Sequence, residues 1–185
     1  MKHNQNTAIS TDLVLVGGGH SHLFVLKHLA MNPIDGLRLT LVTRDLKTPY
    51  SGMLPGYIAG HYRFEQAHID LQPLARYAGA RLIHGEVSSI DPERQILSIP
   101  DRPDIKYDLL SINIGSRPAR GCSVANLDQQ FAIKPIDQFL QSWARFEKQL
   151  SEHDHARELT VVGGGAGGVE LVLALEFRLR KAGLR

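Results

Sequence analysis

Two short apolar runs that lead directly into glycines constrain this chain more than any other feature of its sequence. Residues 13–16 (LVLV) lead into glycines 17–19, and residues 159–162 (LTVV) lead into glycines 163–165. A short apolar run bounded by glycine is typical of a buried parallel strand, and apolar side chains at helical spacing follow each glycine triplet. The repeat therefore predicts two strand–turn–helix units of a doubly wound, Rossmann-like α/β fold.

A turn of this kind can hold a diphosphate. The first glycine allows the sharp turn, the second lets a pyrophosphate approach the backbone, and the third lets helix and strand pack closely, while the helix N-terminus supplies N–H groups and a positive dipole end. The second turn has all three glycines, Gly163, Gly165 and Gly168. The first turn has Gly17 and Gly19 but carries His22 at the third position. Two such turns in matching contexts predict at least one dinucleotide site.

Two histidines in the first turn leave more than one interpretation open. A metal site needs roughly three or four ligands. Neither a cysteine nor an acidic residue lies near His20 and His22 in the sequence, so we assign no metal ligand. Either histidine could contact a phosphate at the start of the helix. Alternatively, His22 only packs between helix and strand and pushes the helix slightly outward.

The residue that holds a ribose is expected about 20 positions after the glycine turn, at the end of the second strand. That strand is predicted over residues 37–42 and is followed by Thr43, Arg44 and Asp45. Asp45 could accept hydrogen bonds from the ribose, Thr43 could offer a weaker hydroxyl contact, or Asp45 could be a solvated turn residue. For the second turn the corresponding position lies beyond Arg185, so the sequence does not distinguish NAD from NADP.

Composition excludes several classes of protein. The 185 residues are 43% hydrophobic and 22% charged, which is typical of a soluble globular protein. Lys and Arg (21) nearly balance Asp and Glu (19), so the charge gives no reason to expect nucleic acid. A single cysteine, Cys122, excludes an internal disulfide. The chain has no apolar run of about 18 residues and no secretory signal, so we expect a cytoplasmic protein without a transmembrane segment.

Periodicity predicts the remaining elements. The expected elements are a helix at 21–31, a loop or broken helix at 48–61, a helix at 67–77, a strand and hairpin within 81–99, a strand at 107–114, a helix at 136–150, a linker at 151–158, a strand at 159–162 and a helix at 169–179. The hairpin would form a small β-hairpin or meander beside the parallel sheet.

Four segments together resemble the two-dinucleotide-binding flavoproteins, the pyridine nucleotide-disulfide oxidoreductase superfamily. They are the first turn at 16–22, the segment 83–87 with 90–92, the strand end at 107–118, and the second turn with 169–171. Asn113 stands where this superfamily usually has alanine. The loop at 48–55 looks most like the type II NADH dehydrogenases, and GGGHSH at 17–22 is similar to oxidoreductases associated with selenide, water dikinase.

The resemblance implies FAD at the first turn, NAD(P)H at the second, and hydride transfer to the flavin and on to an acceptor such as a quinone. It implies that Val87 lies near the adenine, that Gly115 and Ser116 close over the cofactor, and that Glu170 is the catalytic carboxylate on the nicotinamide side. The alternative for Glu170 is a first-turn helix carboxylate stabilised by the helix dipole. The full set of expected cofactor-binding residues is Gly17, Gly18, Gly19, His20, Ser21, His22, Thr43, Arg44, Pro55, Val87, Gly115, Ser116, Gly163, Gly165 and Gly168.

The expected organisation is an FAD-binding part at 1–120, a connecting helix and linker at 121–157, and the beginning of an NAD(P)H-binding domain at 158–185. The rest of the nicotinamide domain would lie beyond Arg185. The expected partners are a nicotinamide dinucleotide and a small electron acceptor, with a homodimer or peripheral membrane association left open. The competing interpretation is a catalytically incomplete nucleotide-binding fragment of a longer flavoprotein.

Overall fold

The computed structural model describes residues 8–116, 132–152 and 159–183. The chain divides into two compact units, which are described separately. The first unit comprises Met1–Thr48 and Asp70–Gly115, and the second comprises Pro49–Ile69 and Ser116–Arg185.

A four-stranded parallel sheet forms the centre of the first unit, with strand order β5-β2-β1-β9. Its strands are β1 (Thr11–Val16), β2 (Leu37–Thr43), β5 (Arg81–His84) and β9 (Leu109–Ile112). In the register of the sheet, Val16 at the end of β1 lies opposite Val42 on one side and Ile112 on the other. The parallel α/β sheet expected from the apolar runs is confirmed.

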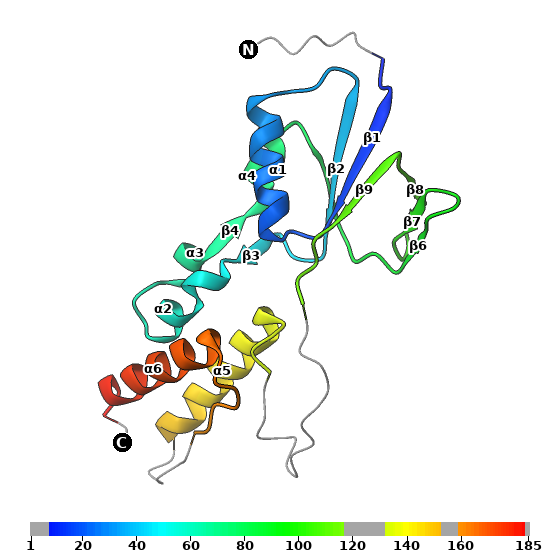
Figure 1. Cartoon of the computed structure of the whole chain (residues 1–185). Coiled ribbons are helices and arrows are strands. Elements are labelled where there is room, and N and C mark those ends of the chain that lie inside the picture. The colour runs from blue at the N-terminus through cyan, green and yellow to red at the C-terminus, as the bar shows by residue number, and fades with distance from the viewer. Residues whose placement is uncertain (1–7, 117–131, 153–158, 184–185) are drawn as a thin grey trace. The chain divides into compact units, whose positions relative to one another are not determined.

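Two different layers cover the two faces of this sheet. Helices α1 (His20–Met31) and α4 (Leu71–Tyr77) lie along one face, and a three-stranded antiparallel sheet lies on the other (Figure 1). That smaller sheet consists of β6 (Ser89–Asp91), β7 (Ile96–Ser98) and β8 (Ile105–Lys106). It packs against Val14, Val16 and Val42 through residues such as Leu97 and Ile105. The expected meander is therefore present, with one strand, β8, that the sequence did not predict.

The helix predicted over 67–77 is wrong in its first part. The chain forms a short helix α3 (Phe64–Ala67), a strand β4 (His68–Asp70) and only then α4. Asp70 caps α4, since its carboxylate accepts a hydrogen bond from the N–H of Gln72 at 2.9 Å. Pro73 then falls in the first helical turn, where no backbone N–H is needed.

The second unit is mainly helical. It contains a 3-10 helix (Ser51–Met53), α2 (Leu54–Ile58), α5 (Ile136–Glu152) and α6 (Ala166–Lys181). Strand β3 (Lys47–Pro49) pairs with β4 as a two-stranded sheet, and the division between the two units falls within both strands. The core joins α2, α5 and α6 through Ile58, Phe139, Trp143, Leu171 and Leu175. An ion pair between Arg178 and Glu147, at 2.6 Å, links α6 to α5.

The strand predicted at 159–162 is not formed. Residues 159–162 pair with no strand among the described residues, and Val162 is 76% exposed. A parallel strand obtains its hydrogen bonds from neighbouring strands, and the described part of the second unit places none beside this segment. The apolar run therefore has the composition of a buried strand without the sheet that would bury it.

Candidate functional site

The first glycine turn joins β1 to α1 and is closely packed against the end of β9. Gly17 has a φ of +94°, and its N–H donates to the carbonyl of Val42 at 2.7 Å. A Cβ atom on Gly17 would collide with the carbonyl of Asn113, and one on Gly19 would collide with the Asn113 side chain. A Cβ on Gly18 would come within 2.5 Å of Leu71. The packing against Asn113 requires Gly17 and Gly19, whatever the turn binds, whereas the contact at Gly18 involves only the end of the flexible Leu71 side chain.

The same turn leaves hydrogen-bond donors available at the head of α1. Gly19 is the N-cap of this helix, and its own N–H donates to the carbonyl of Asn113 at 3.1 Å. Within the part of the chain that the structure describes, the N–H groups of Gly18 and Ser21 have no hydrogen-bond partner. The first turn of α1 contains no acidic residue. Free donors at the positive end of a helix dipole favour an anionic group here.

The carboxyl ends of all four parallel strands meet beside this turn. Hydrogen bonds connect them: Asn113 donates to Val16 at 2.8 Å, and Gly85 donates to Thr43 at 2.9 Å. Open α/β sheets bind ligands at this edge, where neighbouring strands connect in opposite directions. The structure thus brings together five groups of the predicted residues: the first turn, Thr43, Arg44, Val87 and Gly115. The side chain of Val87 packs against the core of the unit, and Gly115 has a φ of +80°.

The residues predicted to hold a ribose are partly engaged by one another. The Thr43 hydroxyl is buried and donates to the backbone carbonyl of Asp45 at 2.9 Å. The guanidinium of Arg44 pairs with the Asp45 carboxylate at 2.6 Å, and both side chains are exposed. Of the two predicted ribose contacts, the Asp45 carboxylate is the more accessible, since the Thr43 hydroxyl is committed to the turn.

His22 is buried at 1% exposure, and both of its ring nitrogens have protein partners. Nδ1 lies 2.7 Å from the carbonyl oxygen of Gly17, and Nε2 lies 2.9 Å from the hydroxyl of Ser111. Burial lowers the pKa of His22 below its ordinary value, although the bond to Gly17 partly opposes this shift. The expected phosphate contact of the His22 ring is therefore replaced by a contact with the turn itself. His20 begins α1, and no metal-binding cluster occurs among the residues described.

The second glycine turn follows the predicted pattern more closely. Gly163 has a φ of +118°, and Gly165 is the N-cap of α6. The N–H of Gly168 donates to the carbonyl of Gly165 at 2.9 Å, and a Cβ atom on Gly168 would collide with the carbonyl of Gly163. The third glycine of this turn is therefore needed for close packing of turn against helix, as the motif predicts.

The remaining predicted residues lie in the second unit, so the structure does not assign them to the edge that carries the first turn. Glu170 is exposed and is the fifth residue of α6, whose first turn contains no acidic residue. The alternative of a first-turn carboxylate is therefore wrong. Pro55 is the second residue of α2, and the hydroxyl of Ser116 accepts a hydrogen bond from Lys134 at 3.1 Å. Cys122 and residues 153–158 lie outside the described residues.

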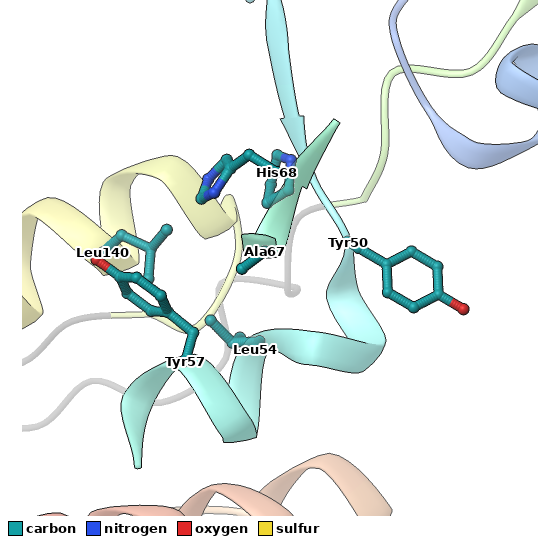
Figure 2. Close-up of a pocket in the computed structure, with 7 residues that line it drawn as sticks. Tyr50, Leu54, Tyr57, Ala67, His68 and Leu140 are labelled. Carbon is teal, nitrogen blue, oxygen red and sulfur yellow. The ribbon is translucent and has the colours of Figure 1, made fainter. Parts of the chain in front are cut away.

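A small hollow in the second unit is lined mainly by aromatic and aliphatic side chains (Figure 2). Its lining residues are Pro49, Tyr50, Leu54, Tyr57, Ala67, His68 and Leu140. The ring of His68 stacks on Phe64 with centroids 3.7 Å apart, and the ring of Tyr50 points away from the other labelled side chains. The His68 ring is already packed and bonded to the Phe64 carbonyl at 2.8 Å, so this hollow adds no chemical group to the site.

Two contributors to the first turn were missed by the sequence analysis. Ser111 holds the far side of the His22 ring, and Asn113 supplies both the carbonyl and the amide that pack against the glycines. The role of Asn113 could have been suspected from the sequence, because asparagine replaces the alanine that is usual at that point of the superfamily motif. The role of Ser111 could not have been predicted, since a serine in an apolar strand does not indicate which residue it will contact.

Comparison with known proteins identifies the family. The profile of the pyridine nucleotide-disulphide oxidoreductase family matches residues 11–184, nearly the whole chain. The chain belongs to this family. Its members bind FAD and use NAD(P)H as a substrate.

Two curated relatives show how much of such a protein is present. The chain is 28% identical to NADH dehydrogenase-like protein YutJ of Bacillus subtilis (strain 168), over 88% of this chain and 44% of that protein. It is 27% identical to the sulfide-quinone reductase of Aquifex aeolicus (strain VF5), over 94% of this chain and 40% of that protein. The chain therefore spans less than half the length of these relatives.

Solved structures confirm the fold. The sulfide:quinone oxidoreductase of Aquifex aeolicus matches 95% of this chain with a TM-score of 0.71 and 20% identity, and the chain covers 41% of it. NADH:rubredoxin oxidoreductase of Clostridium acetobutylicum matches 91% with a TM-score of 0.70 and 22% identity, and the chain covers 42% of it. No helix among the described residues is long and apolar enough to cross a membrane.

Proposed function

We propose that this chain is the flavin-binding part of an oxidoreductase that passes a hydride from NAD(P)H to FAD and then electrons to an acceptor such as a quinone. One observation carries the proposal. Among the described residues, the N–H groups of Gly18 and Ser21 have no hydrogen-bond partner, and they lie at the carboxyl edge of a parallel sheet, next to the head of α1. Family membership supports FAD as the dinucleotide that this turn would take.

The residues at the first turn fit the diphosphate of FAD. The turn carries no side chains at residues 17–19, and Gly18 and Gly19 are only half-buried, so an anion could approach the N–H groups directly. The exposed Asp45 carboxylate lies at the end of β2, where an acidic residue commonly holds the ribose. Val87 and Gly115 follow β5 and β9 at the same edge and would contact the adenine and the flavin side, respectively.

The second turn would hold the NAD(P)H diphosphate with Gly163, Gly165 and Gly168 at the head of α6. Glu170, the proposed catalytic carboxylate, would lie on the nicotinamide side of the flavin. In this assignment residues 1–120 are the first part of the FAD domain and residues 158–185 open the NAD(P)H domain. Pro55 and Ser116 are the proposed contributions of the intervening segments.

The redox chemistry of the reaction would be supplied by FAD, which would serve as the hydride acceptor when bound. The chain's own residues bind and orient. The N–H groups of the first turn would neutralise a diphosphate, and the packing of Gly17 and Gly19 against Asn113 holds the turn beside the end of β9 before binding. Preorganised donors of this kind cost little reorganisation when the ligand arrives.

A catalytically incomplete fragment is the second candidate. It is favoured by the unpaired segment at 159–162, which leads into the second turn without a sheet to hold it. Such a chain would bind FAD at the first turn while reacting poorly with NADH.

The absorption spectrum of the chain loaded with FAD separates these candidates. Bound flavin that NADH bleaches under anaerobic conditions supports the oxidoreductase. Bound flavin that only dithionite bleaches supports the incomplete fragment, and a folded chain that retains no flavin contradicts both.

A further inference from the structure

We propose that His22 is a positioning residue that holds the first glycine turn in its anion-binding conformation, so that the N–H of Gly18 faces the diphosphate of the cofactor. This inference rests on the proposed FAD site. It concerns the one position at which the turn departs from the three-glycine pattern, and it gives that departure a function.

The contact that carries the inference joins His22 to the first glycine of its own turn. Nδ1 of the buried imidazole lies 2.7 Å from the carbonyl oxygen of Gly17. Nε2 lies 2.9 Å from the hydroxyl of Ser111, on the neighbouring strand β9. The ring is therefore fixed at both ends, and it connects the turn to the sheet that supports it.

Peptide geometry transmits this contact to the cofactor side of the turn. The Gly17 carbonyl and the Gly18 N–H belong to one planar, trans peptide unit, so the two groups point in opposite directions. When His22 binds the carbonyl on the helix side, the N–H of Gly18 must face away from the helix interior. Glycine can rotate about its backbone bonds more freely than other residues, so without this anchor the unit could turn over.

The second turn provides an internal comparison. There the third position is Gly168, and the carbonyl of Gly163 approaches it so closely that a Cβ atom would not fit. In the first turn the equivalent carbonyl, that of Gly17, meets the imidazole of His22 instead. One turn is held by direct packing, and the other is held by a hydrogen bond from a side chain.

The protonation state of the ring agrees with this role. Gly17 offers only an acceptor, so Nδ1 must carry the proton, and Nε2 then accepts from the Ser111 hydroxyl. Burial lowers the pKa of His22 and so favours the neutral ring that this arrangement uses.

Two amide substitutions distinguish the Gly17 contact of Nδ1 from the Ser111 contact of Nε2. In His22→Asn the side-chain NH2 replaces Nδ1 and can still donate to Gly17, whereas in His22→Gln the amide reaches the position of Nε2 and the Gly17 contact is lost. Ser111→Ala removes only the Nε2 contact and is the matched control. The dissociation constants of FAD and ADP are measured by titration well below each variant's unfolding temperature, with adenosine as the ligand that has no phosphate.

We expect His22→Gln to weaken FAD and ADP binding roughly three- to tenfold, the range of one lost hydrogen bond, with adenosine unaffected. For His22→Asn and Ser111→Ala, the dissociation constants of FAD and ADP should stay within about twofold of those of the unsubstituted chain. This should hold even where the unfolding temperatures of these variants fall as far as that of His22→Gln. If every variant binds FAD as tightly as the unsubstituted chain does, and the same holds for ADP, the positioning role is overturned and the proposed function still stands. Failure of the unsubstituted chain to bind FAD or ADP would overturn both.

Discussion

At the level of single residues, the two turns meet the same packing requirement in different ways. In the second turn, Gly168 packs directly against the backbone carbonyl of Gly163, with no side chain between them. The first turn inserts an imidazole and uses its hydrogen-bonding capacity to hold the Gly17 carbonyl. The backbone contact of the second turn predicts how stability responds to substitution, and the His22 contact of the first turn predicts how stability depends on pH.

A methyl group at the third position of the second turn should be costly. In Gly168→Ala the new Cβ collides with the Gly163 carbonyl, and overpacking of this kind costs about 1–3 kcal/mol. The adjacent Gly167→Ala is the matched control, because a Cβ there meets nothing within 4 Å. We expect it to be neutral or to stabilise the helix by up to about 1 kcal/mol. Urea unfolding followed by circular dichroism compares the two, and equal effects would contradict the packing assignment.

The His22 pKa predicts a pH dependence of stability. Burial lowers the pKa in the folded chain below the ordinary value of 6.5, so the unfolded chain binds the extra proton first as pH falls. The free energy of unfolding should therefore decrease as pH drops from about 6.5 towards the lowered pKa of the folded state. The other histidines also titrate, so the measurement is the difference between the unsubstituted chain and His22→Asn. A difference that does not change between pH 7 and pH 5 would show that the ring is not held neutral by burial.

At the level of elements, helix α4 shows how a side chain sets a boundary that periodicity misplaces. The predicted helix started at 67, but its first residues form β4, and α4 starts after the Asp70 cap. The cap carboxylate satisfies the N–H of Gln72, which lies in the first turn and has no intrahelical partner.

Removing this cap should destabilise the first unit. Asp70→Ala leaves the Gln72 N–H without its acceptor and should cost about 1 kcal/mol, whereas Asp70→Asn retains a side-chain oxygen and should cost clearly less. Thermal unfolding of the three chains tests the order. An Asn variant as unstable as the Ala variant would assign the effect to charge and not to the capping bond.

What the sequence could predict depended on whether the signal was local. The strands β1, β2 and β9 and the helix α1 were predicted because each carries its own apolar pattern. Strand β8 has two residues and exists only because Ile105 and Lys106 pair with β7, so no local pattern marks it. The segment at 159–162 shows the opposite case, in which a strand pattern lacks a partner. The His22–Ser111 contact joins two elements far apart in sequence, and only the folded sheet brings them together.

At the level of the whole molecule, the chain combines one complete parallel sheet edge, which is the proposed FAD site, with a second glycine turn at the head of α6. The parallel sheet of the first unit has all four strand ends at the first turn. The second unit has the glycine turn and α6, but no described strand pairs with the segment that leads into them. We therefore expect the two proposed nucleotides to differ in their effect on this chain, with FAD bound more firmly than NADH.

Thermal unfolding in the presence of each nucleotide tests the central claim, that the first turn binds a dinucleotide diphosphate. A ligand at 100 times its dissociation constant stabilises the folded state by about 2.7 kcal/mol, which gives a shift of several degrees in a domain of this size. We predict that FAD and ADP raise the unfolding temperature and that adenosine at equal concentration does not. An unfolding temperature that stays the same with saturating FAD, ADP and NADH would contradict the account.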